Sequence, residues 1–336
     1  MNRRNVLWTG TVAMALAVAG LGFGAPALGQ TKMVLKATDV HPLGYPTVEG
    51  VVRLGKKLEA ATNGRLSVQM YPSMQLGGEK EMIEQAQVGA LGFARISVGP
   101  MGSIVDDLNV FNMPFVFRDV PHMQKVIDGP IGAELLAKLT NAPTSKLVGL
   151  CWMDAGARSF YNSKKPIKSI EDLKGLKIRM MGNPIFVETA NALGANGIAM
   201  GYDQLINALQ TGVVDGAENN PPSYETGKHY QFAKYYSQSE HLIIPEILVF
   251  SKVIWDKLSK DDQALLTKLG KETQQEERKL WTEKEAASLA ELKKQNIQIT
   301  TYTPAQKAQF QAAVKPVWDK YGAKYTALVK RIQDVK

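Results

Sequence analysis

Short apolar segments typical of strands alternate with segments of helical spacing along most of the chain, and this alternation is what most restricts the fold. Residues 34–37 and 66–71 have the composition of strands, and residues 47–61 between them have the spacing of a helix that ends at Asn63-Gly64. A strand, a helix and a second strand form a βαβ unit. Repetition of such units predicts α/β lobes with mainly parallel sheets, whose ligand sites lie at the carboxyl ends of strands.

The alternation continues through the middle of the chain and changes character near Ser259. The further predicted segments are helices at 79–88, 184–193 and 202–210 and strands at 147–152, 159–162 and 177–181. Residues 259–295 are rich in charge, with leucines spaced for one buried stripe of a long helix. A strand at 297–301 and a last helical region interrupted at Pro316 follow. A length of 336 residues suits two lobes better than one core.

The first 29 residues have the composition of an export signal. Asn2-Arg3-Arg4 supplies positive charge, residues 12–21 form an apolar run, and Ala25-Pro-Ala27 offers the small residues that a signal peptidase accepts. Arg3-Arg4 also resembles half of a twin-arginine signal, but nothing downstream suggests a cofactor loaded before export, so ordinary secretion is favoured. The mature protein is predicted to be periplasmic or extracellular. Beyond Gln30 no stretch approaches the roughly 18 apolar residues that span a bilayer.

Charge and cysteine content exclude several classes of function. The formal net charge is +8, but the lysine pairs are short and are not interleaved with aromatic residues, so no nucleic-acid partner is predicted. Cys151 is the only cysteine, so no intrachain disulfide can form. It ends an apolar run without a basic neighbour, which is typical of a buried strand residue rather than of a reactive thiol.

The sequence contains no familiar catalytic or metal-binding spacing. G-x-S-x-G, H-E-x-x-H, a P-loop, C-x-x-C and an EF-hand loop are all absent. The four histidines, at positions 41, 122, 229 and 241, lack the spacing of metal ligands. We therefore predict no catalytic residue, no metal site and no cofactor.

Two arginines on neighbouring predicted strands are the best candidates for binding an anion. Arg158 stands near the start of one strand and Arg179 near the end of the next. A guanidinium is always charged, and its planar fork matches a carboxylate with two parallel hydrogen bonds. A single arginine is more often part of a surface or interlobe salt bridge. Two of them in a chain without a catalytic constellation favour a ligand role.

Two polar turns offer further ligand contacts. Asn219, in the run Asp215-Gly-Ala-Glu-Asn-Asn220, can donate and accept hydrogen bonds at once, which suits hydroxyls or a carboxylate oxygen. Asp39 and His41 follow the first predicted strand and could form a polar wall for a ligand. Either segment is equally compatible with an ordinary turn.

Four separated motifs, in this order, resemble the solute-binding protein of tripartite ATP-independent periplasmic (TRAP) transporters over essentially the whole mature chain. They are Gln75-Leu-Gly-Gly-Glu79, Leu173-Lys-Gly-Leu-Lys-Ile-Arg-Met180, Ala192-Leu-Gly-Ala-Asn196 and Ala208-Leu-Gln-Thr-Gly-Val-Val-Asp-Gly-Ala-Glu-Asn219. The resemblance implies an α/β, two-lobed periplasmic solute-binding fold with a ligand cleft between the lobes. It further implies a non-enzymatic monomer that closes on an organic acid and delivers it to a membrane permease.

The resemblance also implies roles for particular residues and boundaries for the lobes. The arginine that pairs with the substrate carboxylate maps onto Arg179, the arginine of the preceding strand onto Arg158, and the asparagine of the D-G-x-E-N run onto Asn219. The implied lobe I covers residues 30–154 and 245–281, and lobe II covers 155–244 and 282–336.

The implied substrate is a hexuronate such as glucuronate or galacturonate. The segment from Thr38 to Glu49, the early Arg95, and the run Glu218-Asn-Asn-Pro-Pro-Ser-Tyr224 are similar to members that bind these sugar acids. The expected partners of the sugar hydroxyls are Asp39, His41, Glu79, Asn219 and Asn183.

Three alternatives stay open. After Arg179 the sequence departs from the polar pattern of the hexuronate-binding members, because Met180 and Met181 stand there, and methionines could line a site for a shorter or aromatic acid. A C4-dicarboxylate or a keto acid is therefore the second choice of ligand. A secreted sugar-acid lyase with Tyr45 or His41 as its base is an alternative of another class, and a periplasmic sensor component is a third.

Overall fold

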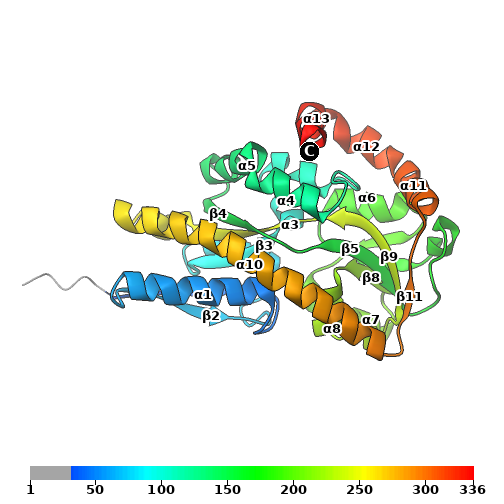
Figure 1. The fold of residues 1–336 in the computed structure, drawn as a ribbon, viewed down its shortest axis with the longest axis horizontal. Helices are drawn as coiled ribbons and strands as arrows, with labels where there is room; N and C mark the ends of the chain where they lie inside the picture. Colours follow the sequence, from blue (N-terminus) through cyan, green and yellow to red (C-terminus); the bar gives the residue numbers. More distant parts are fainter. Residues whose placement is uncertain (1–31) are drawn as a thin grey trace, which may run out of the picture. The chain divides into compact units, whose positions relative to one another are not determined.

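The computed structural model describes residues 32–336, so the predicted export signal lies outside the described part of the chain. Two β-sheets organise this part (Figure 1). Sheet A has the order β2-β1-β3-β10-β4, with strands β2 (Leu66–Tyr71), β1 (Met33–Thr38), β3 (Phe93–Ser97), β10 (Glu246–Ser251) and β4 (Leu147–Met153). Sheet B has the order β11-β9-β5-β8-β6-β7, with β11 (Gln298–Thr300), β9 (Tyr235–Ile243), β5 (Ala157–Asn162), β8 (Gly216–Asn219), β6 (Lys177–Met180) and β7 (Asn196–Ala199). We call the parts built on sheets A and B lobe I and lobe II.

Helices connect the strands of each sheet. Lobe I contains α1 (Pro46–Ala61), α2 (Glu79–Gln87), α3 (Val98–Met101), η1 (Asp106–Asn112), α4 (Val120–Asp128), α5 (Pro130–Asn141) and α9 (Lys252–Trp255). Lobe II contains η2 (Ile170–Leu173), α6 (Pro184–Ala192), α7 (Tyr202–Thr211), α8 (Pro221–Thr226) and η3 (His229–Gln231). The long helix α10 (Lys260–Lys294) follows, and the chain ends with α11 (Pro304–Ala313), α12 (Lys315–Tyr321), η4 (Gly322–Tyr325) and α13 (Thr326–Asp334).

The local signals in the sequence match these elements closely. Strand β2 has the predicted bounds, and α10 begins at the residue after Ser259, whose side chain accepts a hydrogen bond from the backbone of Asp262. Ser169 and Asp172 form a capping box at the start of η2. Pro316 coincides with the break between α11 and α12.

The prediction of mainly parallel sheets is only half right. β1 pairs in parallel with β2 and β3, and β6 pairs in parallel with β7 and β8. In contrast, β10 is antiparallel to β3 and β4, and β5 is antiparallel to β8 and β9. These antiparallel strands are the ones next to the passages between the lobes. The chain enters the new sheet there without a preceding crossover helix, so the rule for βαβ units does not apply.

The chain passes between the two sheets at two short connections, from β4 to β5 and from β9 to β10, and a third time along α10, which leads from sheet A to β11 of sheet B. Gly156, in the first connection, has φ of 60°, a conformation that favours glycine. Helix α10 packs against α1 and β4 of lobe I and against α8 of lobe II (Figure 1). The two short connections span residues 154–156 and 244–245.

The C-terminal segment does not follow the predicted division, which placed residues 282–336 in lobe II. The His122 ring contacts the carbonyl oxygen of Ile332 at 2.9 Å, and Arg118 donates to the carbonyl oxygen of Gln333 at 3.0 Å. Arg331 also forms an ion pair with Glu134 of α5. Helix α13 therefore packs on α4 and α5 of lobe I, because its buried face, with Leu328, Val329 and Ile332, finds an apolar surface there.

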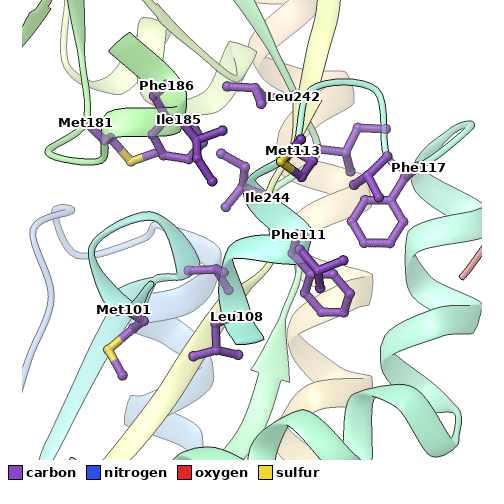
Figure 2. Close-up of a cluster of buried hydrophobic side chains, with 14 of the residues drawn as sticks. Met101, Leu108, Phe111, Met113, Phe117, Met181, Ile185, Phe186, Leu242 and Ile244 are labelled. Carbon is purple, nitrogen blue, oxygen red and sulfur yellow. The ribbon is translucent and has the colours of Figure 1, made fainter. Parts of the chain in front are cut away.

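The largest hydrophobic cluster crosses from one lobe to the other (Figure 2). Leu108 and Phe111 of η1 contribute from lobe I, and Ile185 and Phe186 of α6 from lobe II. Cys151 lies buried on β4 as predicted, and burial raises the pKa of its thiol. Within residues 32–336 no helix is long and apolar enough to cross a membrane.

Candidate ligand-binding site

Sheet B brings Arg158, Arg179 and Asn219 to one edge. Strand β8 lies between β5 and β6, antiparallel to the first and parallel to the second. The start of β5 and the ends of β6 and β8 therefore meet at the same edge, which places these three residues together. Nη1 of Arg158 donates to Oδ1 of Asn219 at 2.7 Å.

A cavity of about 30 Å³ lies between this edge and lobe I. Six of the eight predicted site residues line it: His41, Glu79, Arg95, Arg158, Arg179 and Asn219. A larger cavity of about 520 Å³ adjoins it and shares Glu79, Arg179, Met181 and Tyr202 with its lining. The two cavities together form the candidate site.

The charge of Arg158 is already balanced within lobe II. Its Nε and Nη2 donate to the two carboxylate oxygens of Glu218, at 2.6 and 2.9 Å, and both side chains are buried. Burial alone would lower the pKa of Arg158, but the Glu218 carboxylate outweighs burial and raises the pKa. Arg158 is thus a structural cation that orients Asn219.

Arg179 differs, because its charge has no carboxylate partner among the described residues. Its Nε donates to the carbonyl oxygen of Met200 at 2.8 Å, whereas Nη1 is buried and has no hydrogen-bond partner. Burial lowers the pKa of this guanidinium, and although Glu218 opposes that change, Arg158 adds to it. A buried cation without a partner is costly unless something neutralises it. Arg179 is therefore the residue most suited to accept the carboxylate of a ligand.

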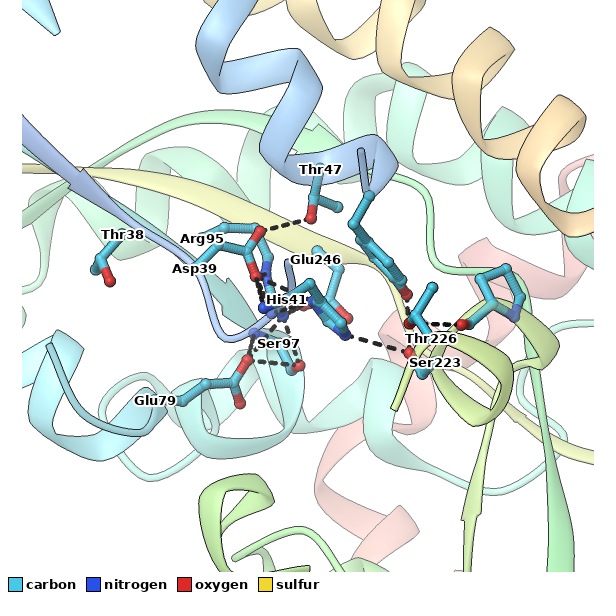
Figure 3. A network of polar contacts seen from close by, with 12 residues as sticks. Thr38, Asp39, His41, Thr47, Glu79, Arg95, Ser97, Ser223, Thr226 and Glu246 are labelled. Carbon is cyan, nitrogen blue, oxygen red and sulfur yellow. Dashed lines mark hydrogen bonds and ion pairs between the residues drawn. The ribbon is translucent and has the colours of Figure 1, made fainter. Parts of the chain in front are cut away.

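Lobe I faces the cavity with carboxylates gathered around Arg95 (Figure 3). Arg95, buried on β3, contacts Oδ1 of Asp39 at 2.6 Å, Oε1 of Glu79 at 2.8 Å and Oε2 of Glu246 at 2.6 Å. Burial raises the pKa of Glu246, although Arg95 opposes this. We call this group the acidic wall of lobe I. Because it has three acids around one cation, it mainly accepts hydrogen bonds.

Asp39 does not line either cavity and acts through its neighbours. It is fully buried, and its carboxylate contacts Arg95, the His41 ring at 3.0 Å and the Thr47 hydroxyl at 2.6 Å (Figure 3). Burial by itself raises the pKa of Asp39, but Arg95 and His41 hold it well below its usual range. Burial and the charge of Arg95 lower the pKa of His41, which favours a neutral ring.

The His41 ring also reaches across to lobe II. Its Nε2 lies 3.2 Å from Oγ of Ser223, which also lies 2.8 Å from the hydroxyl of Tyr45. The His41 and Tyr45 rings stack with centroids 3.7 Å apart. This group ties the two lobes together beside the cavity.

Asn183 does not belong to this group, contrary to the prediction. Its Oδ1 caps α6 by accepting from the backbone of Ile185, and its Nδ2 donates to the carbonyl oxygen of Gly99 and to Oδ1 of Asn109. The amide is thus fully used in a contact between α6 and lobe I. Asn183 was predicted as a partner of a sugar hydroxyl, and in the structure it lines neither cavity.

Sequence reasoning missed several residues of the site. Tyr202, Ser97, Ser223 and Glu246 line the small cavity, and Glu218 pairs with Arg158. Glu246 had a recognisable signal, because it is a lone acid at the start of the apolar run Ile247-Leu-Val-Phe250. The others had no such signal, since Ser and Tyr at a helix start are ordinary.

A buried acid, Glu277, lies on α10 behind the connection from β4 to β5. Its Oε2 accepts from the backbone N–H of Asp154 at 2.8 Å, while Oε1 is buried without a partner among residues 32–336. Burial raises the pKa of Glu277 well above its usual range, the nearby Asp154 and Glu246 raise it further, and Arg278 opposes them.

Replacing Glu277 with glutamine is expected to stabilise the protein at pH 7 by about 1–3 kcal/mol, because it removes the cost of a buried acid. Since the folded-state pKa is raised, the stability that Glu277 contributes is present below its unfolded-state pKa and is lost as pH rises. The advantage of Glu277→Gln should therefore shrink toward pH 4 in urea unfolding. Glu276→Gln, a half-exposed neighbour paired with Lys57, should change stability by about 1 kcal/mol or less. A wild-type protein that is more stable than Glu277→Gln at pH 7 would contradict the expected stabilisation.

Two α/β lobes joined by short connections, with an unpaired buried cation between them, define a protein that binds an anionic solute by closing around it. Residues 37–324 match the model of bacterial extracellular solute-binding proteins, family 7, and the chain belongs to that family.

Solved structures of relatives agree closely with this one. A TRAP periplasmic solute-binding protein from Pseudomonas putida F1, solved with bound D-glucuronate, is 51% identical, has a TM-score of 0.88, and the match covers 90% of this chain and 98% of that one. A Bradyrhizobium protein in complex with α/β-D-galacturonate is 47% identical with a TM-score of 0.86, and the match covers 90% and 100% of the two chains.

A Citrobacter koseri relative has been solved in two states. With bound D-glucuronate it is 46% identical, with a TM-score of 0.88 over 90% of this chain and 100% of that one. The structure described as apo and open gives a TM-score of 0.79 over 90% and 98% of the chains. The present structure therefore resembles the ligand-bound form more than the open form.

Proposed function

We propose that this protein captures a hexuronate, glucuronate or galacturonate, in the periplasm and delivers it as a monomer to the membrane subunits of a TRAP transporter. The observation that carries the proposal is the unpaired, buried Arg179 on lobe II, facing the acidic wall of lobe I. The signal at the N-terminus, the family and the ligands of the relatives support export and transport.

In the proposed mode of binding, the two lobes recognise opposite features of the ligand. The carboxylate of the sugar acid pairs with Arg179, and Asn219 stands beside it, oriented by Arg158. Glu79 and Glu246 accept hydrogen bonds from sugar hydroxyls, while Arg95 and Asp39 hold that wall in place. Closure of the lobes removes water from the ion pair and strengthens it.

The acidic wall of lobe I favours a sugar acid over a dicarboxylate. A C4-dicarboxylate would place its second carboxylate against Glu79 and Glu246, with Arg95 already engaged by acids. Hydroxyls, in contrast, donate to these oxygens. Of the two methionines that suggested a shorter acid, Met180 lies in the core and only Met181 borders the cavities.

A lyase is less consistent with the site. Burial raises the pKa of Tyr45 well above its usual range, and its hydroxyl is engaged with Ser223. His41 has its two ring nitrogens in contact with Asp39 and Ser223. Neither group is free beside a matching acid, as lyase chemistry requires.

The proposal is tested by calorimetric titration of the mature protein with sugar acids and with small acids. D-glucuronate or D-galacturonate should bind with a micromolar dissociation constant, about −8 kcal/mol, and succinate, malate and pyruvate should bind at least about 100-fold more weakly. If a small dicarboxylate or keto acid bound more tightly than the hexuronates, the proposed ligand class would be wrong. Turnover of the sugar acid, followed by NMR, would establish the lyase instead.

A further inference from the structure

The larger of the two cavities, which we call the vestibule, stays wide although the lobes touch on both sides of it. On one side, a Cβ placed on Gly78 would lie 2.9 Å from Oδ1 of Asp203 on lobe II. On the other side, a Cβ placed on Gly99 would lie 2.7 Å from the Phe186 ring. The vestibule, with its volume of about 520 Å³, is thus flanked by contacts between the lobes.

The vestibule begins at the group that holds the ligand acid. Arg179 and Glu79 belong to its lining and to that of the inner cavity, so a sugar acid bound between them starts at the boundary of the two and, because the inner cavity of about 30 Å³ is smaller than a sugar ring, fills the neighbouring part of the vestibule. The ring atoms next to the carboxylate-bearing carbon are the ring oxygen, which leads to the anomeric carbon, and carbon 4. A substituent on carbon 4, or on carbons 1 and 3 one atom further along the ring, is therefore closer to the boundary than one on carbon 2.

The lining of the vestibule selects the chemistry of such a substituent. Ile83, Ile104, Met181, Met200 and Tyr202 offer apolar and aromatic surface. The charged side chains of the outer part are mainly acids, with Glu81, Glu84 and Asp203 against the single Lys80. A second carboxylate would be repelled there, whereas an uncharged ring would pack on the methionines and the tyrosine.

Resting on the proposed function, we infer that the vestibule is a second subsite that takes the uncharged part of a uronate glycoside, so that the protein binds hexuronates linked to a neutral alcohol or sugar as well as the free acid. The acid sugar occupies the boundary at Arg179, and the aglycone extends between α2 and the turn that precedes α7. No bond is made or broken in this binding.

The experiment is a calorimetric titration of the mature protein with D-glucuronate, 4-nitrophenyl β-D-glucuronide and digalacturonate. The aryl glucuronide should bind within about tenfold of D-glucuronate, and digalacturonate should bind at least about tenfold more weakly than the aryl glucuronide. An aryl glucuronide that binds more than tenfold more weakly than the free acid overturns the inference, as does digalacturonate binding as tightly as the aryl glucuronide. If the free sugar acids themselves do not bind, it is the proposed function that fails.

A variant pair at Gly182 locates the aglycone. Gly182 lines the vestibule, lies outside the left-handed region, and an added Cβ there meets no atom within 4 Å. Gly182→Phe should weaken binding of the aryl glucuronide at least about tenfold more than it weakens binding of D-glucuronate, while Gly182→Ala should leave the ratio of the two affinities unchanged. Equal losses for both ligands, or none for the glycoside, would show that the substituent does not lie in the vestibule.

Discussion

Replacing Arg179 with methionine is expected to weaken binding of the sugar acid by at least about 100-fold, because it removes the only arginine lining the small cavity that lacks a carboxylate partner among residues 32–336. Arg179→Lys retains the charge but loses the planar fork, so a loss of about tenfold or more is expected, which is 1.4 kcal/mol. Calorimetric titration with the preferred hexuronate measures both effects.

The free protein provides the control for this result. Removing an uncompensated buried charge should leave the melting temperature of ligand-free Arg179→Met equal to or above that of wild type, while the shift caused by ligand disappears. Lys177→Met is the matched control on the same strand, since the lysine reaches the carbonyl oxygen of Gly212 at an exposed position. Lys177→Met should bind the hexuronate with the affinity of the wild type. Unchanged affinity in Arg179→Met would remove this residue from the site, and loss of folding would show up as a lower melting temperature.

Replacing Arg95 with methionine is expected to destabilise the folded protein by about 3–5 kcal/mol at pH 7, because Asp39, Glu79 and Glu246 then share a buried site without their cation. Chemical unfolding followed by circular dichroism measures the change. Lys138→Met, which removes a cation from a surface pair with Asp107, should cost about 1 kcal/mol or less.

The pH dependence of this loss follows from Asp39. Because Arg95 and His41 hold the pKa of Asp39 below its unfolded-state value, the stability that it contributes is present above that unfolded value and is lost as pH falls through the folded-state value. Without Arg95 the contribution is missing at neutral pH, so the difference between wild type and Arg95→Met should narrow as pH falls below about 4. A difference that stays constant as the pH falls from neutral to well below about 4 would mean that packing, rather than charge, accounts for the role of Arg95.

Arg158 and Arg179 show what residue type alone can predict: it identifies candidate residues but does not distinguish their roles. Both were recognisable as anion-binding candidates on neighbouring strands, and the sheet order places them at one edge. Their roles differ because Glu218 pairs with Arg158 and leaves Arg179 free. Glu218 lies 60 residues from Arg158 along the chain, so no local pattern could reveal which arginine was neutralised.

His41 and Asn183 also show that contacts between residues far apart in the chain could not be predicted from the sequence. His41 was placed at a polar wall, but its contact with Ser223 joins residues 182 positions apart, which only the approach of the lobes creates. Asn183 was predicted to contact a sugar hydroxyl, yet its amide is satisfied by Gly99 and Asn109 on lobe I.

The sequence by itself determined the elements whose causes are local: the βαβ start, the long helix α10 and the break at Pro316. Hydrophobic periodicity, caps and proline act over a few residues, so they can be read from neighbours along the chain. Strand direction at the passages between the lobes, the packing of α13 on lobe I, the free charge of Arg179 and the vestibule were decided by the tertiary structure. Each depends on groups far apart in sequence, whose burial and pairing exist only once the two lobes have come together.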